Sequence, residues 1–262
     1  MANSPLTKSF PTPHARPLSA ICSTLNSVTH LPDLSSITSD AHVESVARYF
    51  GGNGYKADEA TKKRICQCIR SASQRVTPRA TYTLFPISRT LPGGKIVLED
   101  GETLKLPECF SDSGACVVAA AIGTLGERLE NYCRELAGCG KIYESTLFDA
   151  IGTAFLDLLS DRLCSTLEDI GRDIGLAGGD RFAPGIDGYP LEQQHQLFQM
   201  ADSASVGVRL NSSAIMMPAK SISFFMILTK TPHRHSGKDK CMICRLAHCQ
   251  YRATGPKNNS KK

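Results

Sequence analysis

The segment from Arg181 to Pro190 has the residue types of a small-molecule binding loop. It reads RFAPGIDGYP and stands just before an expected helix. Glycine lets the backbone approach a ligand closely, arginine offers a planar fork for a carboxylate, and tyrosine offers a flat face with a hydroxyl. The loop suits a small zwitterionic or nucleoside ligand. On composition alone, a surface turn with a salt-bridged Arg181 is the commoner explanation, because loops of this composition are frequent.

Three cysteines near the end of the chain form a second candidate site. Cys241, Cys244 and Cys249 follow the spacing C-x2-C-x4-C, and thiolates at such spacing can ligate zinc or the iron of a cluster. A closed tetrahedral zinc site needs a fourth ligand. Three histidines lie close in the sequence: His233, His235 and His248. The alternative is a set of reduced thiols without a metal, because the ligand set is incomplete.

An α+β domain is expected to position these residues. Apolar periodicity and capping residues predict helices over 40–50, 58–73, 127–136, 145–167 and 190–200. Alternating or continuous apolar runs predict strands over 82–85, 95–98, 103–106, 115–122, 206–210 and 221–228, with Asp100-Gly101 as a hairpin turn. The Gly- and Asp-rich stretch 171–188 predicts no regular element. The pattern indicates a mainly antiparallel, twisted sheet with flanking helices.

Composition divides the chain into three parts. Residues 1–39 are rich in Ser, Thr and Pro and are expected to be a disordered N-terminal segment. Residues 40–230 are expected to form the α+β domain, and residues 231–262 a cysteine-rich, basic tail. The formal charge is +5, and much of the basic excess lies after Leu228. A short basic tail does not by itself indicate nucleic-acid binding.

Three further expectations concern the surroundings of the protein. No apolar run is long enough to cross a membrane, so no membrane association is expected. Eleven cysteines without a secretory signal favour a reducing compartment, which we expect to be the cytoplasm. We find no nucleotide-binding glycine motif, nucleophile elbow or His-Glu zinc-protease pattern. No catalytic residue is therefore assigned.

Several motifs, taken in order, resemble the activation domain of cobalamin-dependent methionine synthase. The closest resemblance is to short, separately encoded proteins related to that domain. The resemblance covers roughly residues 43–252 and is strongest after Ser145. The motifs are LFDAIG at 147–152, R-x-x-x-G at 181–185 followed by P-L-E-x-Q at 190–194, VGV at 206–208, M-x-P-x-K-S-I-S at 216–223, and C-x2-C-x4-C-x-Y-R at 241–252.

The resemblance implies a fold like that domain's and a site for S-adenosylmethionine. Arg181 would contact the ligand's carboxylate, and the backbone around Ala183, Pro184 and Gly185 would approach the nucleoside. Asp157, where the family usually has Glu, would face the ligand's amino end. The family's Gly-Tyr pair is Gly185-Ile186 here, so Tyr189 is the nearest candidate aromatic. The family's Leu-Thr-Glu-Ser segment is LNSS at 210–213, without the carboxylate.

The implied function is the reactivation of a cobalamin-dependent enzyme. In the family, one-electron reduction is coupled to methyl transfer from S-adenosylmethionine, so the cofactor carries the difficult chemistry. No corrinoid-binding module is evident here, so cobalamin would arrive on a partner, either methionine synthase or another corrinoid protein. The electron would come from a donor such as a flavodoxin or a ferredoxin, and a cluster on the three cysteines could pass it on. Two alternatives remain: an activator of a different corrinoid methyltransferase system, and a binding module that has lost S-adenosylmethionine.

Overall fold

An antiparallel sheet lies at the centre of the structure. The computed structural model describes residues 18–25, 27–30, 40–107, 114–186, 188–231 and 249–252. Within them the sheet order is β4-β3-β2-β5-β9-β6, with β1 also pairing with β2, and every pair is antiparallel. The strands are β1 (Ser27–His30), β2 (Arg79–Leu91), β3 (Lys95–Leu98), β4 (Thr103–Lys105), β5 (Ala115–Thr124), β6 (Ala177–Phe182) and β9 (Ser221–Thr229). A separate ribbon pairs β7 (Arg209–Leu210) with β8 (Met216–Met217).

The middle of the sheet is apolar on both faces. In β5 every residue from Cys116 to Thr124 is buried, which is the pattern of a strand covered on both sides. Val117, Ala119 and Ala121 belong to one core cluster, whereas Val118 and Ala120 belong to another. Successive side chains of a strand point to opposite faces. The sheet therefore separates two hydrophobic layers.

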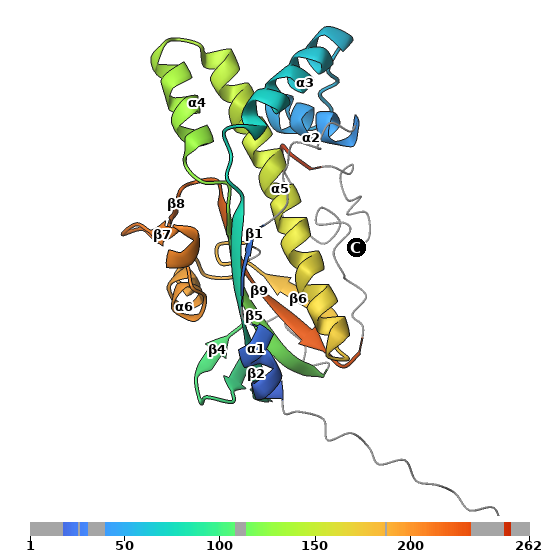
Figure 1. Cartoon of the computed structure of the whole chain (residues 1–262), viewed down its shortest axis with the longest axis vertical. Helices are drawn as coiled ribbons and strands as arrows, with labels where there is room; N and C mark the ends of the chain where they lie inside the picture. The colour runs from blue at the N-terminus through green and yellow to red at the C-terminus, as the bar shows by residue number, and fades with distance from the viewer. Residues whose placement is uncertain are drawn as a thin grey trace, which may run out of the picture.

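Helices cover the two faces unequally (Figure 1). They are α1 (Leu18–Leu25), α2 (Asp40–Gly51), α3 (Glu59–Ser73), α4 (Arg128–Gly138), α5 (Ile142–Asp173), α6 (Gln193–Met200) and the 3-10 turn η2 (Ala204–Val206). The 32-residue α5 lies along one face, and α6 lies on the other. Asp58 caps α3, since its carboxylate accepts the Thr61 N–H at 2.7 Å.

The helix α5 contributes to two cores. Its N-terminal part packs with α2, α3 and α4 in a cluster that includes Phe155 and Leu159. Its C-terminal part packs on the sheet through Leu163 and Leu167. At about 1.5 Å per residue the helix is roughly 48 Å long, so it joins the helical end of the molecule to the sheet. Within the described residues no helix is both long and apolar enough to cross a membrane.

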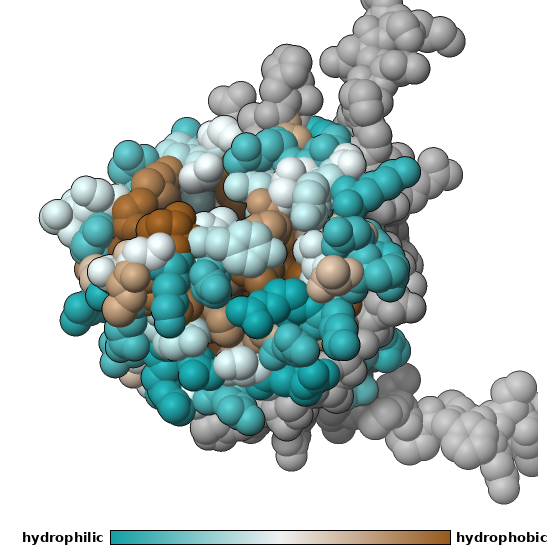
Figure 2. Space-filling model, turned by 90° about the horizontal axis from the view of Figure 1, so that it is seen from above, coloured by the Kyte–Doolittle hydropathy of each residue, from teal (hydrophilic) through white to brown (hydrophobic). Residues whose placement is uncertain are grey.

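The helical end also carries exposed apolar surface. Figure 2 looks onto that end and shows brown apolar surface among teal polar groups. Ile142, the first residue of α5, is 60% exposed, and the neighbouring Tyr143 is 50% exposed. The Tyr143 ring packs edge-on against Phe50 of α2 at a centroid distance of 5.1 Å.

The α+β class and the antiparallel sheet are confirmed, and three local expectations need correction. The stretch 171–188, expected to be irregular, contains β6 and the end of α5. The N-terminal segment, expected to be disordered, contains α1 and β1. The expected strand over 206–210 is mostly turn, because Gly207 adopts the left-handed conformation at φ 72° and only Arg209–Leu210 forms a strand. The boundaries of the three proposed parts of the chain remain a prediction.

Candidate functional site

Two glycines allow β6 to fit between α5 and β9. A Cβ on Gly179 would lie 2.9 Å from the Ile227 carbonyl oxygen, and one on Gly178 would lie 2.8 Å from Cγ of Glu168. Neither position has room for a side chain. The register shifts between Gly178 and Arg181, so that Arg181 pairs with Met226. The strand thereby presents Arg181 to α5.

The Arg181 guanidinium is held against α5 by one of its nitrogens. Nη1 donates to Ser160 Oγ at 2.6 Å and to Cys164 Sγ at 3.5 Å. Cζ lies 4.7 Å from the centroid of the Phe224 ring, a cation–π distance. Ser160 is buried, whereas Arg181 is exposed. Within the described residues Nε and Nη2 have no hydrogen-bond partner, so a second edge of the fork is available to a carboxylate.

Asp157 lies on the same side of α5 as these contacts, one turn earlier. Residues three and four apart are neighbours on a helix surface, which places Asp157 beside Ser160. Its Oδ2 accepts a hydrogen bond from the Tyr49 hydroxyl of α2 at 2.5 Å. Burial raises the pKa of Tyr49, and the hydrogen bond and charge of Asp157 raise it further. A carboxylate on α5 and a guanidinium held beside the next turn of that helix suit the two charges of an amino acid.

The loop after β6 is closed by its own backbone. Gly185 N–H donates to the Tyr189 carbonyl at 2.8 Å, and Ile186 N–H donates to the Ala183 carbonyl at 3.1 Å. Gly185 has φ 83° and is exposed, Ala183 is half-buried and Pro184 is buried. The exposed backbone at Gly185, four residues after Arg181, is therefore open to a ligand.

Tyr189 lies on the other face of the sheet. Its side chain is 3% exposed and packs in the cluster that contains Phe182 and Phe225. Its hydroxyl donates to the Lys105 carbonyl at 2.9 Å, and burial raises its pKa. Arg181 and Phe182 are adjacent in the strand and so point to opposite faces, and the loop carries Tyr189 to the Phe182 side. Tyr189 therefore does not lie on the face of the sheet that carries Arg181.

Two other tyrosines supply aromatic surface near Asp157. Tyr49 stacks against Tyr251 at a ring-centroid distance of 5.5 Å with a tilt of 52°. Arg48 lies over the Tyr49 ring at 4.4 Å and donates a hydrogen bond to the Tyr251 carbonyl. The sequence shows Tyr49 only as one residue of an amphipathic helix, and no local signal marks it for this position.

The structure tests only one of the three tail cysteines. Cys241 and Cys244 lie outside the described residues. Cys249 is half-buried, and its Sγ accepts the Tyr251 N–H at 3.4 Å. Among the described residues no group of three or more His, Cys, Asp or Glu side chains could hold a metal ion. The metal or cluster site remains a prediction.

Comparisons with known proteins support the fold. No family model and no curated protein matches the chain. Among solved structures, the chain is similar to the crystal structure of the MetH reactivation domain bound to AdoHcy, with a TM-score of 0.54. The two are 15% identical, and the match covers 80% of this chain and 81% of that one. The expected fold is thereby confirmed. At this identity the similarity establishes the fold alone.

Proposed function

We propose that the protein binds S-adenosylmethionine where α5 meets β6 and its following loop, a surface that we call the Arg181 site. The observation that carries this proposal is the placement of Asp157 and Arg181 on one side of α5. Arg181 Nη1 is anchored by Ser160, which leaves the rest of the fork for the ligand's carboxylate. Asp157 faces the ammonium group, and its bond to Tyr49 fixes its orientation.

The remaining parts of the ligand have matching surroundings. The exposed backbone around Gly185 allows the nucleoside to approach closely. Gly185 has a positive φ and no Cβ, so no side chain stands in the way. Tyr49 and Tyr251 offer flat surface next to Asp157, the role for which the resemblance gives Tyr189 as the nearest candidate. The solved structure with the similar fold holds AdoHcy, which is S-adenosylmethionine without its methyl group.

We further propose that the protein supports reductive methylation of cobalamin in trans, on methionine synthase or another corrinoid protein. S-adenosylmethionine supplies a methyl group and leaves as S-adenosylhomocysteine, and a donor such as a flavodoxin or ferredoxin supplies one electron. The residues of this chain hold and orient the methyl donor, which is a proximity contribution. The partner binds the cobalamin.

Calorimetric titration with S-adenosylmethionine and with S-adenosylhomocysteine tests the binding step. Arg181→Ala should weaken binding by about 2–4 kcal/mol, which is roughly 30- to 1,000-fold in Kd. Arg172→Ala is the matched control, because Arg172 is an exposed arginine at the far end of α5. Equal affinity in the wild type and Arg181→Ala would remove Arg181 from the site. If S-adenosylmethionine does not bind at all, the better hypothesis is a binding module that has lost this ligand. The observation behind this alternative is exposed Ile186, which stands where the family has tyrosine.

Reconstitution tests the action in trans. A cobalt(II) methionine synthase without its own activation domain is mixed with a reductant and S-adenosylmethionine, and the methylated cofactor is followed by absorbance. Adding the protein should raise the rate, and Asp157→Ala should lower that gain. If no corrinoid protein from the same cell responds, the reactivation role is wrong even where S-adenosylmethionine binds.

A further inference from the structure

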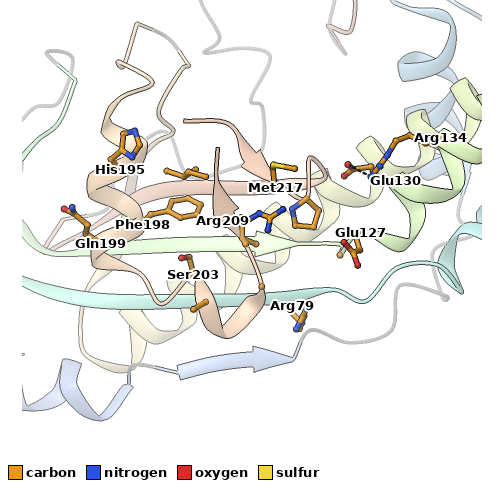
Figure 3. Close-up of a pocket in the computed structure, with 16 residues that line it drawn as sticks. Arg79, Glu127, Glu130, Arg134, His195, Phe198, Gln199, Ser203, Arg209 and Met217 are labelled. Atoms are coloured by element: carbon orange, nitrogen blue, oxygen red, sulfur yellow. Dashed lines mark hydrogen bonds and ion pairs between the residues drawn. The ribbon is translucent and has the colours of Figure 1, made fainter. Parts of the chain in front are cut away.

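A cavity of about 790 Å³ lies away from the Arg181 site. We call it the α4–β7 cleft, since α4, α6, the η2–β7 turn and the residues around β8 line it (Figure 3). Its residue Phe198 packs with the cluster on the α6 face of the sheet, opposite the face that carries Arg181. Small-molecule sites have volumes of about 300–1,000 Å³, so the cleft is large enough for a second ligand.

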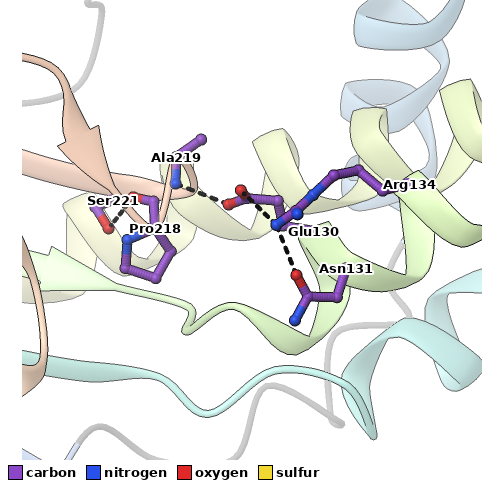
Figure 4. A network of polar contacts seen from close by, with 6 residues as sticks. All are labelled: Glu130, Asn131, Arg134, Pro218, Ala219 and Ser221. Carbon is purple, nitrogen blue, oxygen red and sulfur yellow. Dashed lines mark hydrogen bonds and ion pairs between the residues drawn. The ribbon is translucent and has the colours of Figure 1, made fainter. Parts of the chain in front are cut away.

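The acidic wall of the cleft is partly neutralised within the protein (Figure 4). Glu130 Oε1 accepts from Arg134 at 3.2 Å, and its Oε2 accepts the Ala219 N–H at 2.8 Å. Arg134 also donates to Asn131 at 2.6 Å. Both oxygens of Glu130 and one nitrogen of Arg134 are therefore engaged. Glu127 is the other glutamate lining the cleft, and it is exposed.

Two further arginines of the cleft have no such partner. Within the part of the chain that the structure describes, neither Arg79 nor Arg209 forms an ion pair or a side-chain hydrogen bond. Arg79 Nε is buried and unsatisfied, which is unfavourable for a charged donor. Gly207 stands two residues before Arg209 in the sequence. A Cβ on Gly207 would lie 3.3 Å from Arg79 Nη2. The Arg79 guanidinium therefore borders the turn that leads into β7 and Arg209.

Apolar side chains flank Arg209 in the cleft. Phe198 is half-buried on one side, and Met217 is 40% exposed on the other. Figure 3 shows the Arg209 guanidinium extending from β7 into the space between these two side chains and α4. Unpaired guanidinium groups beside an aromatic ring and a thioether suit a molecule with a charged oxygen group on an apolar body.

We propose that the α4–β7 cleft is a second binding site, for a small organic oxyanion. Arg79 and Arg209 hold the carboxylate or phosphate, and Phe198 and Met217 contact the apolar body. His195, which also lines the cleft, offers a further polar contact. The cleft is independent of the Arg181 site, and it needs no metal.

The test is nuclear magnetic resonance of the full chain with its arginine Nε–H groups observed directly. The probes are phenyl phosphate, benzoate and inorganic phosphate, with benzyl alcohol as the uncharged analogue. Phenyl phosphate or benzoate should shift the Arg79 Nε–H signal saturably, and inorganic phosphate should bind more weakly than phenyl phosphate. Benzyl alcohol should not shift it. Whichever of the two charged aromatic probes binds more tightly identifies the oxyanion.

Two variants at exposed positions separate binding from folding. Arg209→Gln should raise the Kd of the better probe at least fivefold, whereas Arg172→Gln on α5 should leave it unchanged. The affinity for S-adenosylmethionine should be the same in Arg209→Gln and the wild type, which distinguishes the cleft from the Arg181 site. The proposal is overturned if neither charged aromatic probe gives a saturable shift, or if Arg209→Gln binds the better probe as the wild type does.

Discussion

The hydrogen bond between Tyr49 and Asp157 should be measurable as a stability difference. Tyr49→Phe removes only the hydroxyl and keeps the ring that contacts Tyr251 and Arg48. A hydrogen bond to a charged group contributes roughly 1.5–3 kcal/mol. This pair is only part-buried, so we expect a loss of about 1–2 kcal/mol. In a domain of this size that lowers Tm by about 2–8 °C.

The assay is thermal and urea unfolding of a double-mutant cycle. Tyr49→Phe is made in the wild type and in Asp157→Ala. In the Asp157→Ala background, Tyr49→Phe should lower the free energy of unfolding by about 1 kcal/mol less than it does in the wild type, because the partner of the hydroxyl is already absent. Tyr143→Phe is the control: its ring also packs on a neighbouring helix, and within the described residues its hydroxyl has no hydrogen-bond partner. We expect that variant to unfold within about 0.5 kcal/mol of the wild type.

Two outcomes would refute the reasoning. If Tyr49→Phe costs no more than Tyr143→Phe, the hydroxyl does not bond to the carboxylate in solution. If the cost is real but equal in both backgrounds, the hydroxyl has another partner. In either case Asp157 would lose the contact with Tyr49 that orients it.

Two further predictions concern stability. Gly179→Ala should destabilise the protein by about 1–3 kcal/mol in urea unfolding, because the new methyl group would lie 2.9 Å from the Ile227 carbonyl oxygen. A variant as stable as the wild type would show that β6 can move away from β9. Burial is the larger cause, and the nearby charge of Asp149 the smaller one, that raises the pKa of the Cys133 thiol from 9.0 to about 11. The protonated thiol therefore contributes its full stability below pH 9, and this contribution is lost as the pH rises to about 11. Cys133→Ala should make this alkaline fall shallower, whereas the exposed Cys139→Ala should not; identical slopes for the wild type and Cys133→Ala would contradict the assignment.

Sequence patterns predicted the elements whose stabilising contacts lie within a few residues along the chain. Asp58 caps its helix by a bond to a residue three positions along, and Asp100-Gly101 closes a hairpin between adjacent strands. The strand β6 was missed because Gly178 and Gly179 lower strand propensity. They are there because α5 and β9 leave no room for side chains, which only the tertiary structure reveals.

The candidate site was predictable only in part. Asp157 and Arg181 were expected from the resemblance, and the structure places them on the same side of α5. The position of Tyr189 could not be predicted, because it depends on which face of the sheet the loop reaches after Phe182. Tyr49 and Tyr251 are about two hundred positions apart and meet through tertiary contacts alone. The α4–β7 cleft also depends on segments distant in sequence.

The length of α5 has a consequence for how the molecule opens. The helix belongs to two cores, and the change from one to the other falls between Leu159 and Leu163. Such a junction allows the helical end to unfold locally as one cooperative unit while the sheet stays closed. Ser160 lies at that junction, Asp157 lies just before it, and the hydrogen bond from Tyr49 joins Asp157 to α2. A molecule bound across Asp157 and Arg181 would therefore connect two cooperative units, so that the free energy of local opening would depend on whether the Arg181 site is occupied.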